Sequence, residues 1–203
     1  MVYSLYSLFS LLALVISVTS SPIVGQVSGV KRDDVAQPQP QTCTEMSGKI
    51  VWTAIAFHLR STLQLSSPTE VQSGTSLLTF NLSNPAVGYE LFCQATSDDI
   101  TNFFTANQEF SCDSPSDDPS AKASFKFDKP SGTFELSQVW YCNDDMSSRW
   151  TASGSTNVTL NCIPTISNKD ERMERSGEIY ATNNIDCGTI DVPVAPSQMD
   201  AVA

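Results

Sequence analysis

The sequence predicts an all-β protein with a single domain, folded as an antiparallel β-barrel or sandwich that disulfide bonds hold together. Short stretches in which apolar and polar residues alternate recur along the chain, with turn residues between them, and this pattern is typical of such folds. Helical patterns are limited to one or two short turns. The chain has 203 residues, is 40% hydrophobic and contains six cysteines. This composition favours a hydrophobic core in a fold that disulfide bonds cross-link.

The N-terminal segments are expected to be removed before the protein works. Residues 5–18 are mostly apolar, but this run is too short to cross a bilayer comfortably. We therefore predict a secretory signal peptide over residues 1–20. Residues 21–32 are interpreted as a short propeptide or linker that ends in the dibasic site Lys31-Arg32, although two ordinary linker charges would look the same. The mature protein is expected to be secreted and extracellular.

The charge balance and the motif content exclude several classes of function. A net charge of −11 repels phosphate groups and anionic lipids, so nucleic acid and membranes are poor partners. The chain has no Walker loop, no glycine-rich dinucleotide turn, and neither an HExxH nor a GxSxG motif. A single histidine and the lack of a CxxC pair argue against a metal site. We predict no cofactor, no metal and no catalytic residue.

The first half of the predicted domain, residues 43–194, contains three strands. Residues 50–57 are apolar on both faces, which predicts a strand buried on two sides. Residues 78–83 alternate, and Asn84-Pro85 ends that strand because proline cannot donate to the ladder. A further alternating strand spans residues 87–93.

The second half begins with a hairpin. Its turn is residues 129–132, where proline and glycine occupy the positions that a type I turn favours. Alternation over residues 150–160 predicts a long final strand. Two short helical turns are expected, one capped by Ser97 and one over residues 168–175. Residues 195–203 are expected to be a loose tail.

Several residues could carry chemistry, but each has a simpler interpretation. The one histidine, His58, follows an apolar strand beside Arg60, so we expect it at a rim rather than in a catalytic site. Three acidic pairs could bind calcium or hydrolyse glycosides, but solvated loop charge explains them better: Asp98-Asp99, Asp117-Asp118 and Asp144-Asp145. Four aromatic residues could stack on carbohydrate, but core packing is the commoner role: Trp52, Trp140, Trp150 and Tyr141.

Two sequons predict N-linked glycans. Asn81-Leu82-Ser83 and Asn157-Val158-Thr159 both match the acceptor pattern. Both asparagines fall on the polar side of their predicted strands. An outward face leaves room for a glycan, so we expect both sites to be modified.

The six cysteines are expected to form three disulfides: Cys43, Cys93, Cys112, Cys142, Cys162 and Cys187. Cys93 ends one strand and Cys112 begins the next segment, so we expect these two to pair. Cys142 and Cys162 are not expected to pair, because Cys162 lies about 13 residues beyond the start of the next strand, roughly 40 Å when extended. A kink at Gly154 would bring them together, and this alternative stays open.

The order of these features resembles a known family. VWTAIAFHLR leads to YELFC, then to EFSC, to FKFDKPSGTFELSQ and finally to TLNC. Over roughly residues 43–192 this order is similar to the Alternaria major-allergen (AA1-like) family of fungal secreted β-barrels. The resemblance implies a small, disulfide-bonded, extracellular protein of a fungus. Members of the family are known as allergens and as elicitors or effectors acting on plants, without a settled enzymatic activity.

The resemblance also bears on the cysteines. The family pattern implies a Cys162–Cys187 bond, which leaves Cys43 for Cys142. The alternative is Cys43–Cys187 together with Cys142–Cys162. In the family's best-known member a cysteine placed like Cys43 links two protomers, but Cys142 has no clear counterpart there. The resemblance therefore leaves a dimer open without implying a covalent one.

Two functions remain open at this stage. We favour a non-enzymatic effector or elicitor that contacts a host extracellular protein or a cell-wall component. The alternative is a barrel that binds a small apolar ligand or a cell-wall glycan. A barrel mouth lined by converging aromatic and carboxylate side chains would favour the ligand. A filled interior with function on the outer surface would favour the partner.

Overall fold

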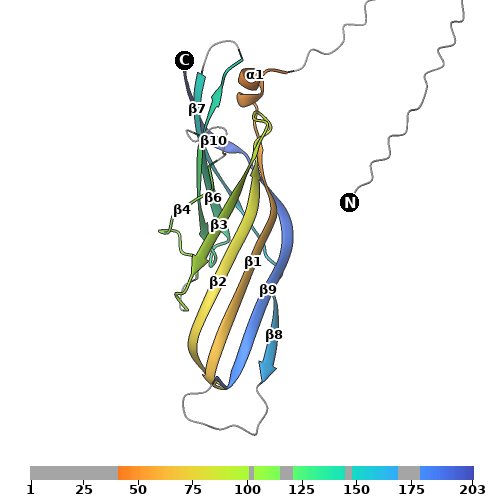
Figure 1. The fold of residues 1–203 in the computed structure, drawn as a ribbon, viewed down its shortest axis with the longest axis vertical. Coiled ribbons are helices and arrows are strands. Elements are labelled where there is room, and N and C mark those ends of the chain that lie inside the picture. The colour runs from red at the N-terminus through yellow and green to blue at the C-terminus, as the bar shows by residue number, and fades with distance from the viewer. Residues whose placement is uncertain (1–40, 101–102, 115–120, 145–147, 169–178) are drawn as a thin grey trace, which may run out of the picture. The chain divides into compact units, whose positions relative to one another are not determined.

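Ten strands and one short helix make up the part of the chain that the computed structural model describes (Figure 1). That part comprises residues 41–100, 103–114, 121–144, 148–168 and 179–203. All of these belong to one unit, residues 39–203. The predicted signal peptide, the propeptide segment and the Lys31-Arg32 site lie outside the described residues.

The strands form two antiparallel sheets of five strands each. The first sheet has the order β3 (Glu90–Ser97), β2 (Glu70–Ser83), β1 (Trp52–Ser67), β9 (Ala181–Val194) and β8 (Ile163–Asn168). The second has the order β10 (Pro196–Val202), β7 (Ser148–Asn157), β6 (Thr133–Cys142), β5 (Lys122–Asp128) and β4 (Phe110–Ser111). The all-β prediction is confirmed as a sandwich; a barrel closed by ladders is not what the described strands form.

The sheets pack face to face over an interior filled with aromatic rings. Phe57 of β1 and Phe80 of β2 meet side chains of the facing sheet. Phe80 and Phe125 stand edge to face with ring centres 4.9 Å apart, and Phe57 and Phe134 do so at 5.3 Å. The expected alternation in β2, β3 and the β5–β6 hairpin is what supplies this core, because every second side chain turns inward.

The strand β1 differs from the expectation that residues 50–57 are buried on two sides. It buries one face only, and Ala56, with φ at 54°, sits where the pairing register with both neighbouring strands shifts. Such a bulge inserts one extra residue, so Ala54 and Phe57 both turn into the core although they are three positions apart. The bulge therefore explains why this run looks apolar on both faces.

The C-terminal tail is the second correction. Residues 195–203 were expected to be loose, but β10 pairs along β7 from Pro196 opposite Gly154 to Val202 opposite Arg149. The alternating segment that begins at Trp150 is therefore not the final strand; it is β7, with three further strands after it.

Neither of the two predicted helical turns is found in the described residues. β3 runs through Ser97, and no helix follows it in residues 98–100. Of residues 168–175, only Asn168 is described, at the end of β8. The helix that does form, α1 (Cys43–Ser47), was not predicted.

The described cysteines form the three favoured bonds, Cys43–Cys142, Cys93–Cys112 and Cys162–Cys187. The alternative that pairs Cys142 with Cys162 is wrong in this structure. Cys162 directly precedes β8, which pairs with the strand β9 that carries Cys187. Cys142 ends β6 in the other sheet, so the two cysteines belong to different layers.

Candidate functional site

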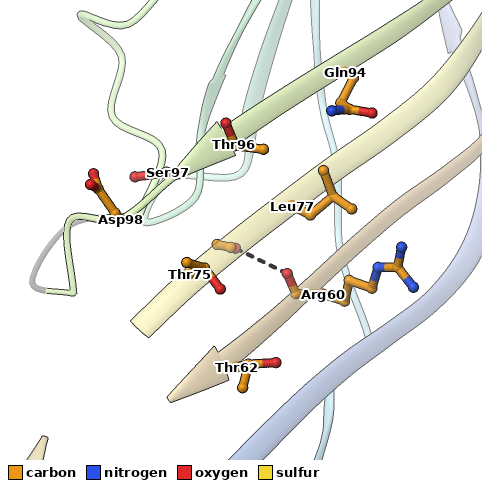
Figure 2. A pocket seen from close by; sticks show the side chains of 9 residues that line it. Arg60, Thr62, Thr75, Leu77, Gln94, Thr96, Ser97 and Asp98 are labelled. Carbon is orange, nitrogen blue, oxygen red and sulfur yellow. Dashed lines mark hydrogen bonds between the residues drawn. The ribbon is translucent and has the colours of Figure 1, made fainter. Parts of the chain in front are cut away.

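An open groove of about 620 Å³ lies across β1, β2 and β3 (Figure 2). It is on the outer face of the first sheet, because its side chains alternate along each strand with side chains buried in the core. The lining side chains are mostly polar, with one leucine among them: Arg60, Thr62, Leu77, Gln94, Thr96 and Asp98.

The register of the three strands assembles this groove. Arg60 of β1 is directly opposite Leu77 of β2, and Leu77 is directly opposite Thr96 of β3. Side chains in such a cross-strand row lie about 5 Å apart. The row therefore presents a guanidinium group, an apolar side chain and a hydroxyl group next to one another.

Two buried serines hold the strands together beneath the groove. The hydroxyl groups of Ser61 and Ser76 are 2.6 Å apart. The Ser76 hydroxyl also donates to the backbone carbonyl of Arg60 at 3.2 Å, which is the dashed line in Figure 2. Both side chains are on the inner face, where solvent is excluded. A hydrogen bond in that setting is costly to break, so it keeps the backbone that carries Arg60 in place.

An ion pair borders the groove on the side of β9. Nε2 of His58 lies 3.0 Å from a carboxylate oxygen of Asp186, and the backbone N–H of Gly188 donates to the same oxygen at 2.8 Å. These two hydrogen bonds, with the charges of His58 and Arg60, hold the pKa of Asp186 below its ordinary value. His58 was expected at a rim, but β1 continues to Ser67 and is the central strand of the first sheet, so His58 lies within the sheet on its outer face.

The groove has the chemistry of a binding surface. A guanidinium group stays protonated at any physiological pH and presents a rigid fork of donors that fits a carboxylate. The threonine hydroxyls and the Gln94 amide both donate and accept hydrogen bonds. In the described ranges, no group of three or more His, Cys, Asp or Glu side chains is placed to hold a metal ion.

The aromatic residues weighed as a carbohydrate platform are mainly core residues. Trp52 and Trp140 are fully buried, with their rings edge to face 6.4 Å apart. Trp150 is half-buried and stacks on Trp140 at 6.2 Å. Buried rings cannot offer a face to a sugar, so the core interpretation is confirmed for the two fully buried tryptophans.

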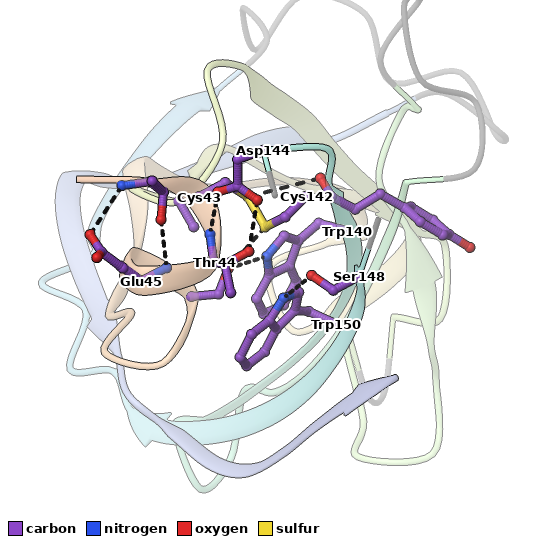
Figure 3. The surroundings of a disulfide bond; sticks show 12 residues. Cys43, Thr44, Glu45, Trp140, Cys142, Asp144, Ser148 and Trp150 are labelled. Carbon is purple, nitrogen blue, oxygen red and sulfur yellow. Dashed lines mark hydrogen bonds between the residues drawn. A yellow bond between two sulfur atoms is a disulfide. The ribbon is translucent and has the colours of Figure 1, made fainter. Parts of the chain in front are cut away.

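A disulfide and several hydrogen bonds connect α1 to the second sheet at one end of the sandwich (Figure 3). The disulfide was predicted from the sequence, and the hydrogen bonds were not. The Cys43–Cys142 bond ties the helix to β6. Asp144 is exposed, as expected for loop charge, and it also accepts hydrogen bonds from the backbone N–H and the hydroxyl of Thr44, both at 2.8 Å. The first turn is further capped by Thr42 and Glu45, a reciprocal pairing whose T-x-x-E spacing is visible in the sequence.

The other predicted site residues are far apart in the fold. Asn81 is exposed on the outer face of β2, and Asn157 is exposed at the end of β7 in the other sheet. The groove itself was not predicted, apart from the placing of Arg60 next to His58. The only sign of the groove in the sequence is that polar residues alternate with apolar ones in the three strands that carry it.

The comparison with protein families matches residues 61–187, more than half of the chain, to the family model for Alternaria alternata allergen 1. The chain belongs to the Alternaria alternata allergen 1 family. The matched span starts within β1 and ends at Cys187, so it contains all of β2 and β3, whereas α1 and Cys43 precede it. No curated protein and no solved structure matches the chain significantly.

Family membership and the three disulfides fit an allergen-like protein that leaves the cell, because disulfides persist in oxidising compartments. Within the described part of the chain, none of the helical structure has the length and apolar character that crossing a membrane requires.

Proposed function

We propose that this protein is a secreted, non-enzymatic fungal protein of the effector or elicitor type, which binds an extracellular component of a plant host. The observation that supports this most directly is the filled interior. Phe80, Phe125 and Phe134 contact one another between the sheets, so the groove over β1, β2 and β3 is on the outside. Function on an outer surface favours a macromolecular partner.

The groove suggests what the partner presents. Arg60 is exposed on a chain whose net charge is −11, so it is a local cation on an acidic protein. A carboxylate on the partner would be attracted to this fork of donors while the acidic surroundings disfavour polyanions. Leu77, beside Arg60, adds an apolar contact. We propose a host extracellular protein as the partner and Arg60 as the residue at the centre of the contact.

The test is retention of host proteins by purified mature protein on a support. Extracellular fluid of the host plant is passed over wild type, Arg60→Glu and Lys122→Glu. Lys122 is exposed on β5 in the other sheet, and its variant makes the same change of charge. We expect one set of host proteins on wild type and Lys122→Glu and its loss on Arg60→Glu. Equal retention by all three, or equal loss from both variants, would contradict the proposal.

A cell-wall glycan is the second candidate, because hydroxyl and amide side chains line the groove. A small apolar ligand inside the sandwich is less favoured, since aromatic rings fill that space. Retention on isolated cell-wall material, lost in Arg60→Glu and kept in Lys122→Glu, would select the glycan over the host protein.

A further inference from the structure

One row of side chains on the outer face of the first sheet combines a glycosylation sequon with exposed apolar surface. Asn81 of β2 is directly opposite Phe92 of β3 on one side and Ile55 of β1 on the other. Phe92 is 45% exposed, the only exposed phenylalanine among the described residues, and Ile55 is half-buried. Asn81 itself is exposed between them.

Phe92 is on the edge strand β3, and its exposure contrasts with the burial of most other phenylalanine rings in the described residues. Six phenylalanines are fully buried in the core: Phe57, Phe80, Phe104, Phe125, Phe127 and Phe134. A single exposed apolar side chain is common on protein surfaces, so the significance of Phe92 depends on its neighbours in the row. Asn81, the acceptor of the sequon Asn81-Leu82-Ser83, lies in the same row. A glycan attached to Asn81 would therefore be held next to these apolar side chains.

The reach of an attached sugar fits this neighbourhood. Directly opposite residues in an antiparallel pair have Cβ atoms about 4.5–5.5 Å apart. A sugar linked to the Asn81 amide nitrogen would project from the outer face of the sheet, on the same side as the Phe92 ring. One face of a pyranose ring carries only C–H groups, and an aromatic ring is the surface that such a face covers best.

We propose that Phe92 and Ile55 form a binding site for the first sugar of the N-glycan on Asn81, so that this glycan stabilises the fold. The proposal rests on modification of Asn81, which the sequon predicts. It is independent of the partner contact at Arg60, because the residues that carry it are in a different row of the sheet.

The second sequon is a control that the chain itself offers. Asn157 ends β7 opposite Thr133, and the Thr133 hydroxyl donates to its side-chain carbonyl at 3.5 Å. The residue across the ladder is therefore polar. A glycan there is expected to add no stability, since no exposed apolar side chain lies opposite it.

The experiment compares variants secreted from a yeast that attaches N-glycans. Ser83→Ala and Thr159→Ala each remove one sequon hydroxyl without changing the asparagine. Each is made with and without Phe92→Ala, glycan occupancy is read from peptide masses, and unfolding is followed in urea. We expect Ser83→Ala to lower the folding equilibrium constant about two- to fivefold when Phe92 is present. It should change nothing in the Phe92→Ala background, and Thr159→Ala should change nothing in either.

A further comparison locates the effect in the first sugar. An endoglycosidase that leaves a single sugar on each asparagine should retain the stability of the untreated protein. If Ser83→Ala lowers stability equally with and without Phe92→Ala, the proposal is overturned, because the glycan would then act without Phe92. Secreted protein with an unmodified Asn81 would also overturn it. The outcome of the host-protein retention assay with Arg60→Glu does not depend on the outcome of these glycan experiments.

Discussion

The indole N–H of Trp52 donates to the side-chain carbonyl of Gln138 at 2.7 Å, joining β1 to β6 across the interior of the sandwich. The same oxygen accepts a second hydrogen bond from the side-chain amide of Asn84 at 2.9 Å. All three side chains are buried. One glutamine oxygen therefore satisfies two buried donors, so the polar groups in this part of the core depend on a single acceptor.

The first prediction concerns this acceptor. Gln138→Leu keeps much of the volume but leaves the donors of Trp52 and Asn84 unpaired, and we expect it to lower the free energy of unfolding by about 2–4 kcal/mol. Gln94→Leu is the matched control, since Gln94 is exposed on the outer face, and should change stability by less than about 0.5 kcal/mol. Urea unfolding measures both. Similar losses in the two variants would show that the shared acceptor is unimportant.

The second prediction concerns acid. The pKa of Asp186 is lowered mainly by the Gly188 N–H, and then by His58 and by the charge of Arg60. A carboxyl with a lowered pKa in the folded state stabilises the fold above its unfolded pKa of about 3.9 and loses that contribution as the pH falls through the folded value. Asp186→Asn should therefore be less stable than wild type at about pH 5, and the difference should close towards about pH 2. A difference that stays constant, or grows in acid, would contradict this assignment.

The third prediction ranks two disulfides by the length of chain that they close. Cys43 and Cys142 are separated by 99 positions, and Cys162 and Cys187 by 25. A cross-link restricts the unfolded chain more when its loop is longer. Replacing both members by serine should cost about 4–5 kcal/mol for the first pair and about 3 kcal/mol for the second. The reverse order in urea unfolding would count against this account, and a non-reducing peptide map without a Cys43–Cys142 peptide would exclude the bond.

The fourth prediction concerns the close approach of β10 to β7. A Cβ atom on Gly154 would lie 2.4 Å from the backbone carbonyl oxygen of Ala195. Gly154→Ala should therefore push β10 away, lower stability by about 1–3 kcal/mol and speed hydrogen exchange in residues 196–202.

Gly88→Ala is the control for this effect, because nothing lies within 4 Å of a Cβ built there. Unchanged exchange in β10 of the Gly154→Ala variant would mean that the approach is not tight in solution.

The strands that could be predicted are those with one dry face and one wet face. Every second side chain is buried from Ser76 to Leu82 in β2 and along β3. The β5–β6 hairpin follows directly from Lys129-Pro130-Ser131-Gly132. These features are local, because alternation and turn residues appear within a few positions of one another. The family resemblance depended on the same local features and on the cysteine spacing, and it is confirmed over residues 61–187.

The features that were missed depend on residues far apart in the sequence. Most of β10 is exposed, so no alternation marks it, and it becomes a strand only because β7 supplies hydrogen-bond partners. The bulge at Ala56 shifts the register of β1 against both of its neighbours, and no residue type announces it. α1 is only five residues long, and it is secured by Asp144 and Cys142 of a distant segment.

The sequence by itself determined the fold class, the secretory character expected of the chain and the set of cysteines, because hydrophobic period and residue type carry that information. Tertiary structure alone decided which outward residues are neighbours. Arg60, Leu77 and Thr96 form a row, and so do Ile55, Asn81 and Phe92, only through the pairing register of three strands. A shift of one residue would turn each of these side chains to the other face of the sheet, so neither the groove nor the glycan contact can be derived from any one strand alone.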